Sequence, residues 1–119
     1  MKQNLVLLAD GQHAVFTVDG DRVAILNLET GRASVFDGSR PVVSADGTSV
    51  AFTSVIDGAN TINVVRAGGQ PTVAFQTPDE IENLALSPDG TTVVFQRMIR
   101  ENWELMVVTS GNVLPRQLT

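Results

Sequence analysis

The stretch LALSPDGTTVVF, residues 84–95, consists of two short apolar segments joined by Ser-Pro-Asp-Gly. Proline presets φ, aspartate bonds nearby backbone amides and glycine supplies a positive φ, so the corner is typical of a tight turn between two β-strands. The same Asp and Ser side chains could instead supply oxygen ligands to a cation such as calcium. Whether the corner recurs along the chain decides between these interpretations.

The corner recurs twice, with decreasing fidelity. Moving the sequence by 43 positions places Ser-Ala-Asp-Gly at 44–47 on Ser-Pro-Asp-Gly at 87–90, and Phe52 on Phe95, with no gap. An earlier copy keeps the Asp-Gly-x4-Phe spacing at Asp10, Gly11 and Phe16. A repeat of this period favours the turn interpretation over the ligand interpretation. The repeated turn residues are Asp10, Gly11, Asp46, Gly47, Asp89 and Gly90.

Each copy contains four short segments rich in Val, Ile, Thr and Phe, separated by Gly, Asp, Asn or Pro, as expected of strands. The best helical candidate is TPDEIENLAL at 77–86, but the repeat places residues 84–86 on a strand. Four strands every 40 or so residues predict the four-stranded antiparallel blades of an all-β propeller. The expected blades are residues 1–38, 39–79 and 80–119.

The third copy resembles the WD40-like repeat of TolB-type β-propellers, and is similar to blades of the tricorn protease and of prolyl-oligopeptidase propellers. The resemblance rests on Ser-Pro-Asp-Gly at 87–90, the strand ending near Phe95, Asn-Trp-Glu-Leu at 102–105 and the terminal Leu-Thr. The second copy replaces the proline with Ala45, and the first keeps little beyond its Asp, Gly and Phe. The resemblance implies a propeller, commonly of six blades, but propellers serve many functions.

Three blades are fewer than the four to eight of typical propellers, so two apolar sheet faces need a partner. We expect a homo-oligomer, and favour a dimer in which blade 3 of each copy meets blade 1 of the other and closes a six-bladed ring. The alternative is that missing blades of a longer or truncated propeller complete the ring.

Composition argues against several kinds of partner. The chain has a net charge of −5 and only eight Lys and Arg residues, which argues against nucleic acid. It has no cysteine, and no apolar run approaches the length of a membrane span. We therefore expect no nucleic-acid binding, no membrane insertion and no cofactor or metal.

No arrangement typical of catalysis is found. His13 is the single histidine, it lies near the first turn, and no Gly-x-Ser-x-Gly elbow is present. The acids at Asp79, Glu80 and Glu82, and those at Asp19 and Asp21, lie in connections where acids are ordinarily solvated. The chain is therefore not expected to be an enzyme.

The segments between the second and third strands of copies 2 and 3, residues 54–60 and 97–102, are expected to be long loops on the face that also carries the links between blades. Loop residues there include types favoured in protein interfaces. The favoured alternative is that the tryptophan packs on its blade while the arginines pair with Glu101 and Glu104. The candidate protein-binding residues are Arg97, Met98, Ile99, Arg100 and Trp103.

Three functions are compatible with these features. The leading hypothesis is a non-catalytic, TolB-like propeller scaffold for protein–protein interaction, with a protein or peptide as partner. The first alternative is a structural, self-assembling propeller fragment with no ligand of its own. The second is the substrate-gating propeller portion of a peptidase.

Overall fold

The computed structural model describes residues 5–8, 11–66, 69–109 and 116–117. Its described residues form three four-stranded antiparallel sheets, which confirms the predicted all-β, blade-like architecture. Blade 1 contains β1 (Val6–Leu7), β2 (His13–Val18), β3 (Arg22–Asn27) and β4 (Ala33–Asp37). Blade 2 contains β5 (Ser39–Val43), β6 (Ser49–Ile56), β7 (Ala59–Arg66) and β8 (Thr72–Thr77). Blade 3 contains β9 (Ile81–Leu86), β10 (Thr92–Ile99), β11 (Asn102–Thr109) and β12 (Arg116–Gln117).

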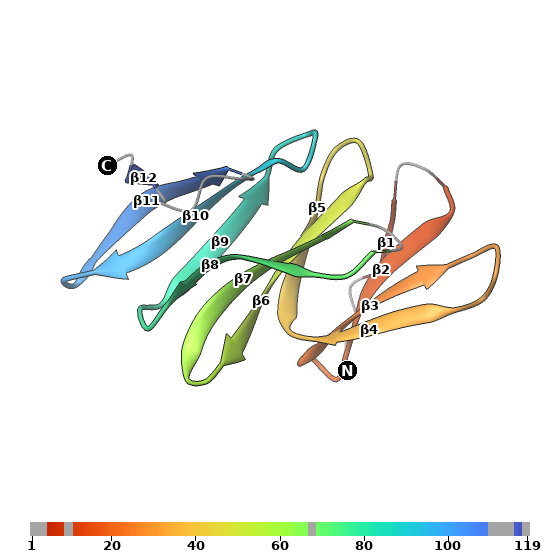
Figure 1. The fold of residues 1–119 in the computed structure, drawn as a ribbon, viewed down its shortest axis with the longest axis horizontal. Coiled ribbons are helices and arrows are strands. Elements are labelled where there is room, and N and C mark those ends of the chain that lie inside the picture. The colour runs from red at the N-terminus through yellow and green to blue at the C-terminus, as the bar shows by residue number, and fades with distance from the viewer. Residues whose placement is uncertain (1–4, 9–10, 67–68, 110–115, 118–119) are drawn as a thin grey trace.

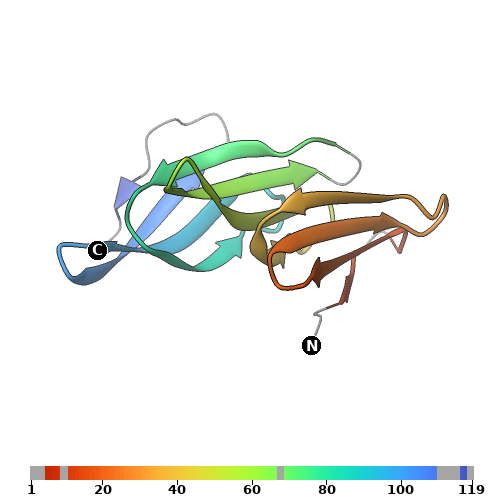
Figure 2. The same cartoon turned by 90° about the horizontal axis from the view of Figure 1, so that it is seen from below.

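The strands of each blade are neighbours in chain order, so every blade is a simple meander. Blade 2 lies between the other two, and the three sheets follow one another across the molecule (Figure 1, Figure 2). The segment 81–86, which has helical features in sequence, is strand β9 and pairs with β10. Pairing with a neighbouring strand therefore outweighs the local helical signal of its acidic residues.

The core is divided into two layers, one on each side of blade 2. Each layer combines buried side chains from two neighbouring blades, so blade–blade packing is the main source of hydrophobic stabilisation. The first layer contains Leu8, Val15, Val23, Ile25, Val50, Phe52 and Val65. The second contains Ile62, Ile81, Val93, Phe95, Met106 and Val108.

An aromatic pair marks each boundary between blades. Phe36 of the outer strand β4 stacks on Phe52 of β6, with ring centroids 6.0 Å apart. Phe75 of β8 packs on Phe95 of β10 at 5.2 Å. Phe52 and Phe95 are repeat counterparts, so the same contact is made twice: the outer strand of one blade meets the second strand of the next.

The prediction of long loops at 54–60 and 97–102 is wrong. Strands β6 and β7 pair out to Ile56 and Ala59, and strands β10 and β11 pair out to Ile99 and Asn102. Each hairpin closes with a two-residue turn, 57–58 or 100–101, and both turn residues have positive φ. Positive φ at both positions matches the twist of the flanking strands, so the additional residues lengthen the sheet instead of forming a loop.

Candidate functional site

One end of the blades combines the links between blades with the tips of the second-to-third-strand hairpins. We call it the connection face; it lies along the lower edge of Figure 1. Backbone hydrogen bonds fix the links there: the amide of Gly38 donates to the carbonyl of Asp21 (2.9 Å), and the amide of Met98 donates to the carbonyl of Glu80 (3.0 Å). The links are therefore held against the hairpins, as a rigid binding surface requires.

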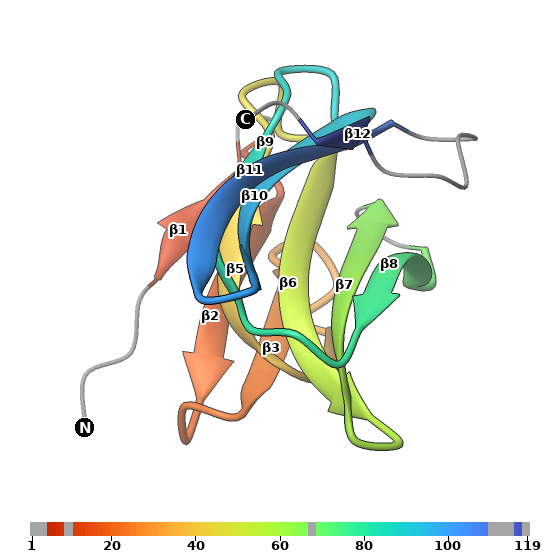
Figure 3. The same cartoon turned by 90° about the vertical axis from the view of Figure 1, so that its left-hand side faces the viewer.

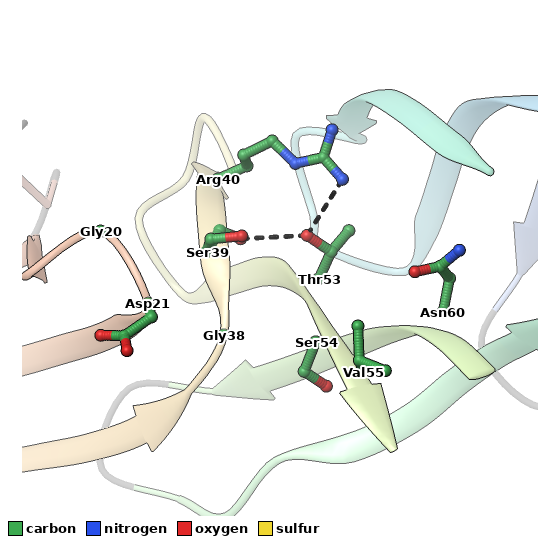
Figure 4. A pocket seen from close by; sticks show the side chains of 9 residues that line it. All are labelled: Gly20, Asp21, Gly38, Ser39, Arg40, Thr53, Ser54, Val55 and Asn60. Carbon is green, nitrogen blue, oxygen red and sulfur yellow. Dashed lines mark hydrogen bonds between the residues drawn. The ribbon is translucent and has the colours of Figure 1, made fainter. Parts of the chain in front are cut away.

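A shallow pocket of about 240 Å³ lies on this face where blades 1 and 2 meet (Figure 4). Its lining comes from the β2–β3 turn of blade 1, the link to blade 2 and three strands of blade 2, and it exposes polar and apolar surface in about equal parts. A small pocket of this kind between rigid elements suits a partner side chain that has an apolar part and a hydrogen-bonding group. The lining residues are Gly20, Asp21, Gly38, Ser39, Arg40, Thr53, Ser54, Val55 and Asn60.

Arg40 occupies an unusual backbone position in this pocket. Its φ is +53°, and the register between β5 and β6 shifts beside it. Its repeat counterpart Asn83 has a φ of +56° beside the equivalent irregularity in β9. The bulge directs the guanidinium of Arg40 across the blade boundary, where Nη2 donates to the carbonyl oxygen of Ile81 at 3.1 Å. Arg40 therefore joins blade 2 to blade 3.

A second polar bond ties the hairpin of blade 2 to the next link. Asn60, near the start of β7, donates through Nδ2 to the carbonyl oxygen of Asp79 at 2.8 Å. In the repeat register, Asn60 corresponds to Trp103, and the pocket residues Ser54 and Val55 correspond to Arg97 and Met98. The predicted binding residues of blade 3 are thus counterparts of residues that line the pocket in blade 2.

The five predicted binding residues do not share one surface. Arg97 and Ile99 point toward blade 2. The Arg97 Nη2 and the Asp79 Oδ2 are 2.9 Å apart, and the guanidinium lies 5.3 Å from the ring centroid of Phe75. Ile99 packs against the second core layer. Arg97 therefore pairs with Asp79, an acid of the blade link that the sequence-based alternative did not name.

The other three predicted residues are more accessible. Arg100 is exposed in the two-residue turn at the tip of the β10–β11 hairpin. Met98 and Trp103 are cross-strand partners on the other side of the sheet from Arg97. Trp103 keeps 38% of its surface exposed. The Trp103 side chain is therefore only partly packed on its own blade.

The Asp-Gly corners lie at the opposite end of the blades. In the third corner, the Asp89 Oδ1 accepts hydrogen bonds from the Ser87 hydroxyl (2.8 Å), the Thr91 hydroxyl (2.7 Å) and the Thr91 amide (3.1 Å). These bonds, led by that of the Thr91 hydroxyl, lower the pKa of Asp89 to about 2. The carboxylate is thus used inside its own turn.

The second corner repeats this geometry. The Asp46 Oδ1 accepts from the Thr48 hydroxyl, the Ser44 hydroxyl and the Thr48 amide, and these bonds lower the pKa of Asp46. The Asp46 amide also donates to the carbonyl oxygen of Pro88 at 3.0 Å, which joins neighbouring corners. Asp10 of the first corner lies outside the described residues, whereas Gly11 has the same positive φ as Gly47 and Gly90.

Histidine and carboxylate side chains are the remaining candidates for chemistry in the part of the chain that the structure describes. His13 begins β2, beside the first turn, and is half-buried. Among the described residues, no three His, Asp or Glu side chains lie close enough together to hold a metal ion. Nor does any helix in those residues have the length and apolarity needed to cross a membrane.

Sequence reasoning missed Arg40 and Asn60 as residues of this face. The sequence feature that could have identified them is their position in the repeat, because each has a counterpart 43 residues later. It identifies equivalent positions, but it does not show that a bulge turns Arg40 toward the next blade. That geometry depends on the strand register, which a single sequence does not determine.

Comparison with known proteins extends only to structure. No family model matches the sequence, and the search of curated proteins found no significant match. Similar solved structures include TolB from Acinetobacter baumannii (22% identity, TM-score 0.64, covering 98% of this chain and 32% of that one) and the putative TolB from Agrobacterium tumefaciens (16%, 0.68, 98% and 45%).

The β-propeller domain of the Trilobed protease from Pyrococcus furiosus is also similar (13% identity, TM-score 0.65, covering 100% of this chain and 44% of that one). The chain spans less than half the length of each of these three proteins. Its three blades superpose on part of a propeller in every case. The chain has a TolB-like β-propeller fold.

Proposed function

We propose that this chain is a non-catalytic β-propeller scaffold that binds a protein or peptide on its connection face. The observation that carries the proposal is the exposure of two apolar residues at the tip of the β6–β7 hairpin. Val55 is 69% exposed and Ile56 is 39% exposed. Exposed apolar residues held together by rigid strands are typical of protein-binding surfaces.

Charged and polar groups lie on the same face as this tip. Arg100 is exposed at the end of the β10–β11 hairpin, and the pocket lined by Asp21 and Arg40 lies on the same end of the molecule. An apolar centre with arginine and hydrogen-bonding groups around it is the usual composition of a protein interface. The fold itself is compatible with many functions, so the proposal depends on this surface.

The non-catalytic part of the proposal is supported by composition and geometry. The chain has one histidine and no cysteine, and His13 lies on β2 near the corner end, away from the connection face. Two acids of the connection face pair with nearby arginines: Asp79 with Arg97, and Asp19 with Arg22. These are structural ion pairs, not an arrangement of acid and base.

A binding experiment with matched variants tests this proposal. Immobilised wild-type protein, Arg100→Ala and Arg32→Ala would each be used to capture proteins from a cell extract. Arg32 is an exposed arginine between β3 and β4, at the opposite end of the blades, so it controls for loss of charge alone. We expect a protein retained by the wild type and by Arg32→Ala to be lost with Arg100→Ala. Equal capture by all three would contradict a binding role for the connection face.

We also propose that a second copy of the chain supplies the remaining blades. The residues that the structure describes form three blades, and closed propellers typically contain four to eight. Two copies would supply six. Each copy would then contribute its own connection face to one ring, and the two sets of hairpin tips would form a continuous binding surface.

A further inference from the structure

Blade 2 shows how this chain covers the two faces of a sheet. One face packs on blade 1 through the first core layer, and the other packs on blade 3 through the second. Blades 1 and 3 each have one face of this kind, and their other faces point away from blade 2 (Figure 1). We call these the outward faces. In Figure 3, blade 3 lies in front of the other blades.

The outward face of blade 3 carries the repeat counterparts of residues that blade 2 packs against blade 3. Strand alternation places Leu105 and Val107 on this face, because the intervening Met106 belongs to the second core layer. In the repeat register they correspond to Ile62 and Val64, which pack in that layer from the blade 2 side. The outward face of blade 3 thus repeats a surface that already covers a blade.

The outward face of blade 1 carries the complementary set. Leu7, Phe16 and Leu26 correspond in the repeat to Leu86, Phe95 and Val108 of blade 3. Those three residues of blade 3 pack against blade 2 in the second core layer. Leu7 is 61% exposed. Blade 1 therefore presents the surface that a blade uses to accept a preceding blade.

Two local features also suggest that another blade packs on the outward face of blade 1. Phe52 and Phe95 each meet an aromatic ring from the preceding blade, and Phe16 is their counterpart on an outward face. Gly90 packs so closely on Ser49 of the preceding blade that an added Cβ would clash with its side chain. At the counterpart Gly11, an added Cβ would meet nothing within 4 Å.

We infer that the outward face of blade 3 in one copy docks on the outward face of blade 1 in another copy, and that the contact is made twice in a closed dimer. The inference rests on the proposed completion of the ring by a second copy, and it identifies the surfaces that do so. An end blade that stayed exposed to water would need a polar outer face, as the capping repeats of other arrays have. Both outward faces carry large apolar side chains instead: Leu105 and Val107 on blade 3, and Phe16 and Leu26 on blade 1.

Trp103 and Met98 are expected to lie in this contact between copies. Their blade 2 counterparts Asn60 and Val55 lie on the side of that sheet that is turned toward blade 3, and Asn60 bonds to the link that follows it. Trp103 and Met98 lie on the same side of blade 3 as Val107. In the closed dimer they lie at the connection-face end of the new boundary, so part of the predicted binding patch contacts the second copy.

Charge substitutions on the two outward faces test the docking. Val107→Glu changes blade 3, Phe16→Glu changes blade 1, and each is expected to weaken self-association by roughly a hundredfold or more, because burial of an unpaired carboxylate is costly. A one-to-one mixture is expected to recover a two-chain species, since one intact face of each kind remains. Val73→Glu, on the exposed outer strand of blade 2, is the matched control and should associate like the wild type.

Sedimentation of these proteins separates the possible outcomes. Single variants that associate like the wild type would overturn the assignment of the faces, although self-association itself would stand. Single variants that dissociate and do not recover on mixing would also overturn the head-to-tail pairing. A wild type that never associates would instead overturn the proposed ring completion, on which the inference rests.

A measurement on the unmodified chain does not depend on how well the variants fold. Trp103 is the single tryptophan, and it is partly exposed in one copy. Its emission is expected to shift to longer wavelength, and to become easier to quench with acrylamide, as the wild type is diluted and dissociates. Emission that stays constant through a measured dissociation would show that Trp103 lies outside the contact, and would contradict the inferred boundary.

Discussion

At the scale of single residues, the corner aspartates show how a motif that resembles a ligand site becomes structural. Asp89 accepts three hydrogen bonds within its own turn, two of them from hydroxyl groups. The corner also needs glycine, because Gly90 has a φ of +78° and lies against Ser49 of the preceding blade. The motif is therefore repeated because each blade needs the same turn and the same close contact.

The pKa of Asp89 makes this role testable. The hydrogen bonds lower it from 3.8 to about 2, so folding favours the ionised carboxylate. The resulting stabilisation is present above about pH 4 and is lost as the pH falls toward 2. Asp89→Ala is expected to lower the urea midpoint at neutral pH, and its difference from the wild type should shrink in acid. A difference that is the same at both pH values would contradict this account.

At the scale of elements, the hairpins show where sequence reasoning was insufficient. The spacing of Phe52 and Phe95 predicts the strands correctly, because a buried aromatic must recur at the same place in every blade. The ends of those strands were not predictable from composition. Residues 100–101 contain no glycine, yet they form a two-residue turn because the pairing of β10 with β11 continues to Ile99 and Asn102. Strand register, not local propensity, decides this.

A glycine in the two-residue turn at 100–101 is expected to stabilise the protein. Glu101 has a φ of +68°, a conformation that costs a residue with a Cβ about 1 kcal/mol more than glycine. Glu101→Gly is therefore expected to raise the free energy of unfolding by roughly 0.5–1 kcal/mol, measured by urea titration. Gly58 has the equivalent position in blade 2, and Gly58→Ala should lower stability. No gain from Glu101→Gly would argue for a flexible loop instead of an extended hairpin.

At the scale of the whole molecule, the repeat predicts the number of blades, and the described residues form three sheets. The repeat does not by itself predict which side chains meet between neighbouring blades. The pairing of Phe36 with Phe52, and of Phe75 with Phe95, becomes evident only when the blades are placed side by side. What occupies the outward faces depends on contacts beyond one chain, so the order of residues alone leaves both kinds of completion open.

The central claim is that two copies complete one propeller, and the mass of the wild-type protein in solution tests it most directly. Each chain has a mass of 12.7 kDa. Sedimentation equilibrium over a range of concentrations is expected to show a closed species of twice that mass, with no growth to larger assemblies, because each ring uses both of its blade 1 and blade 3 faces. A species of 12.7 kDa at every concentration would contradict the account.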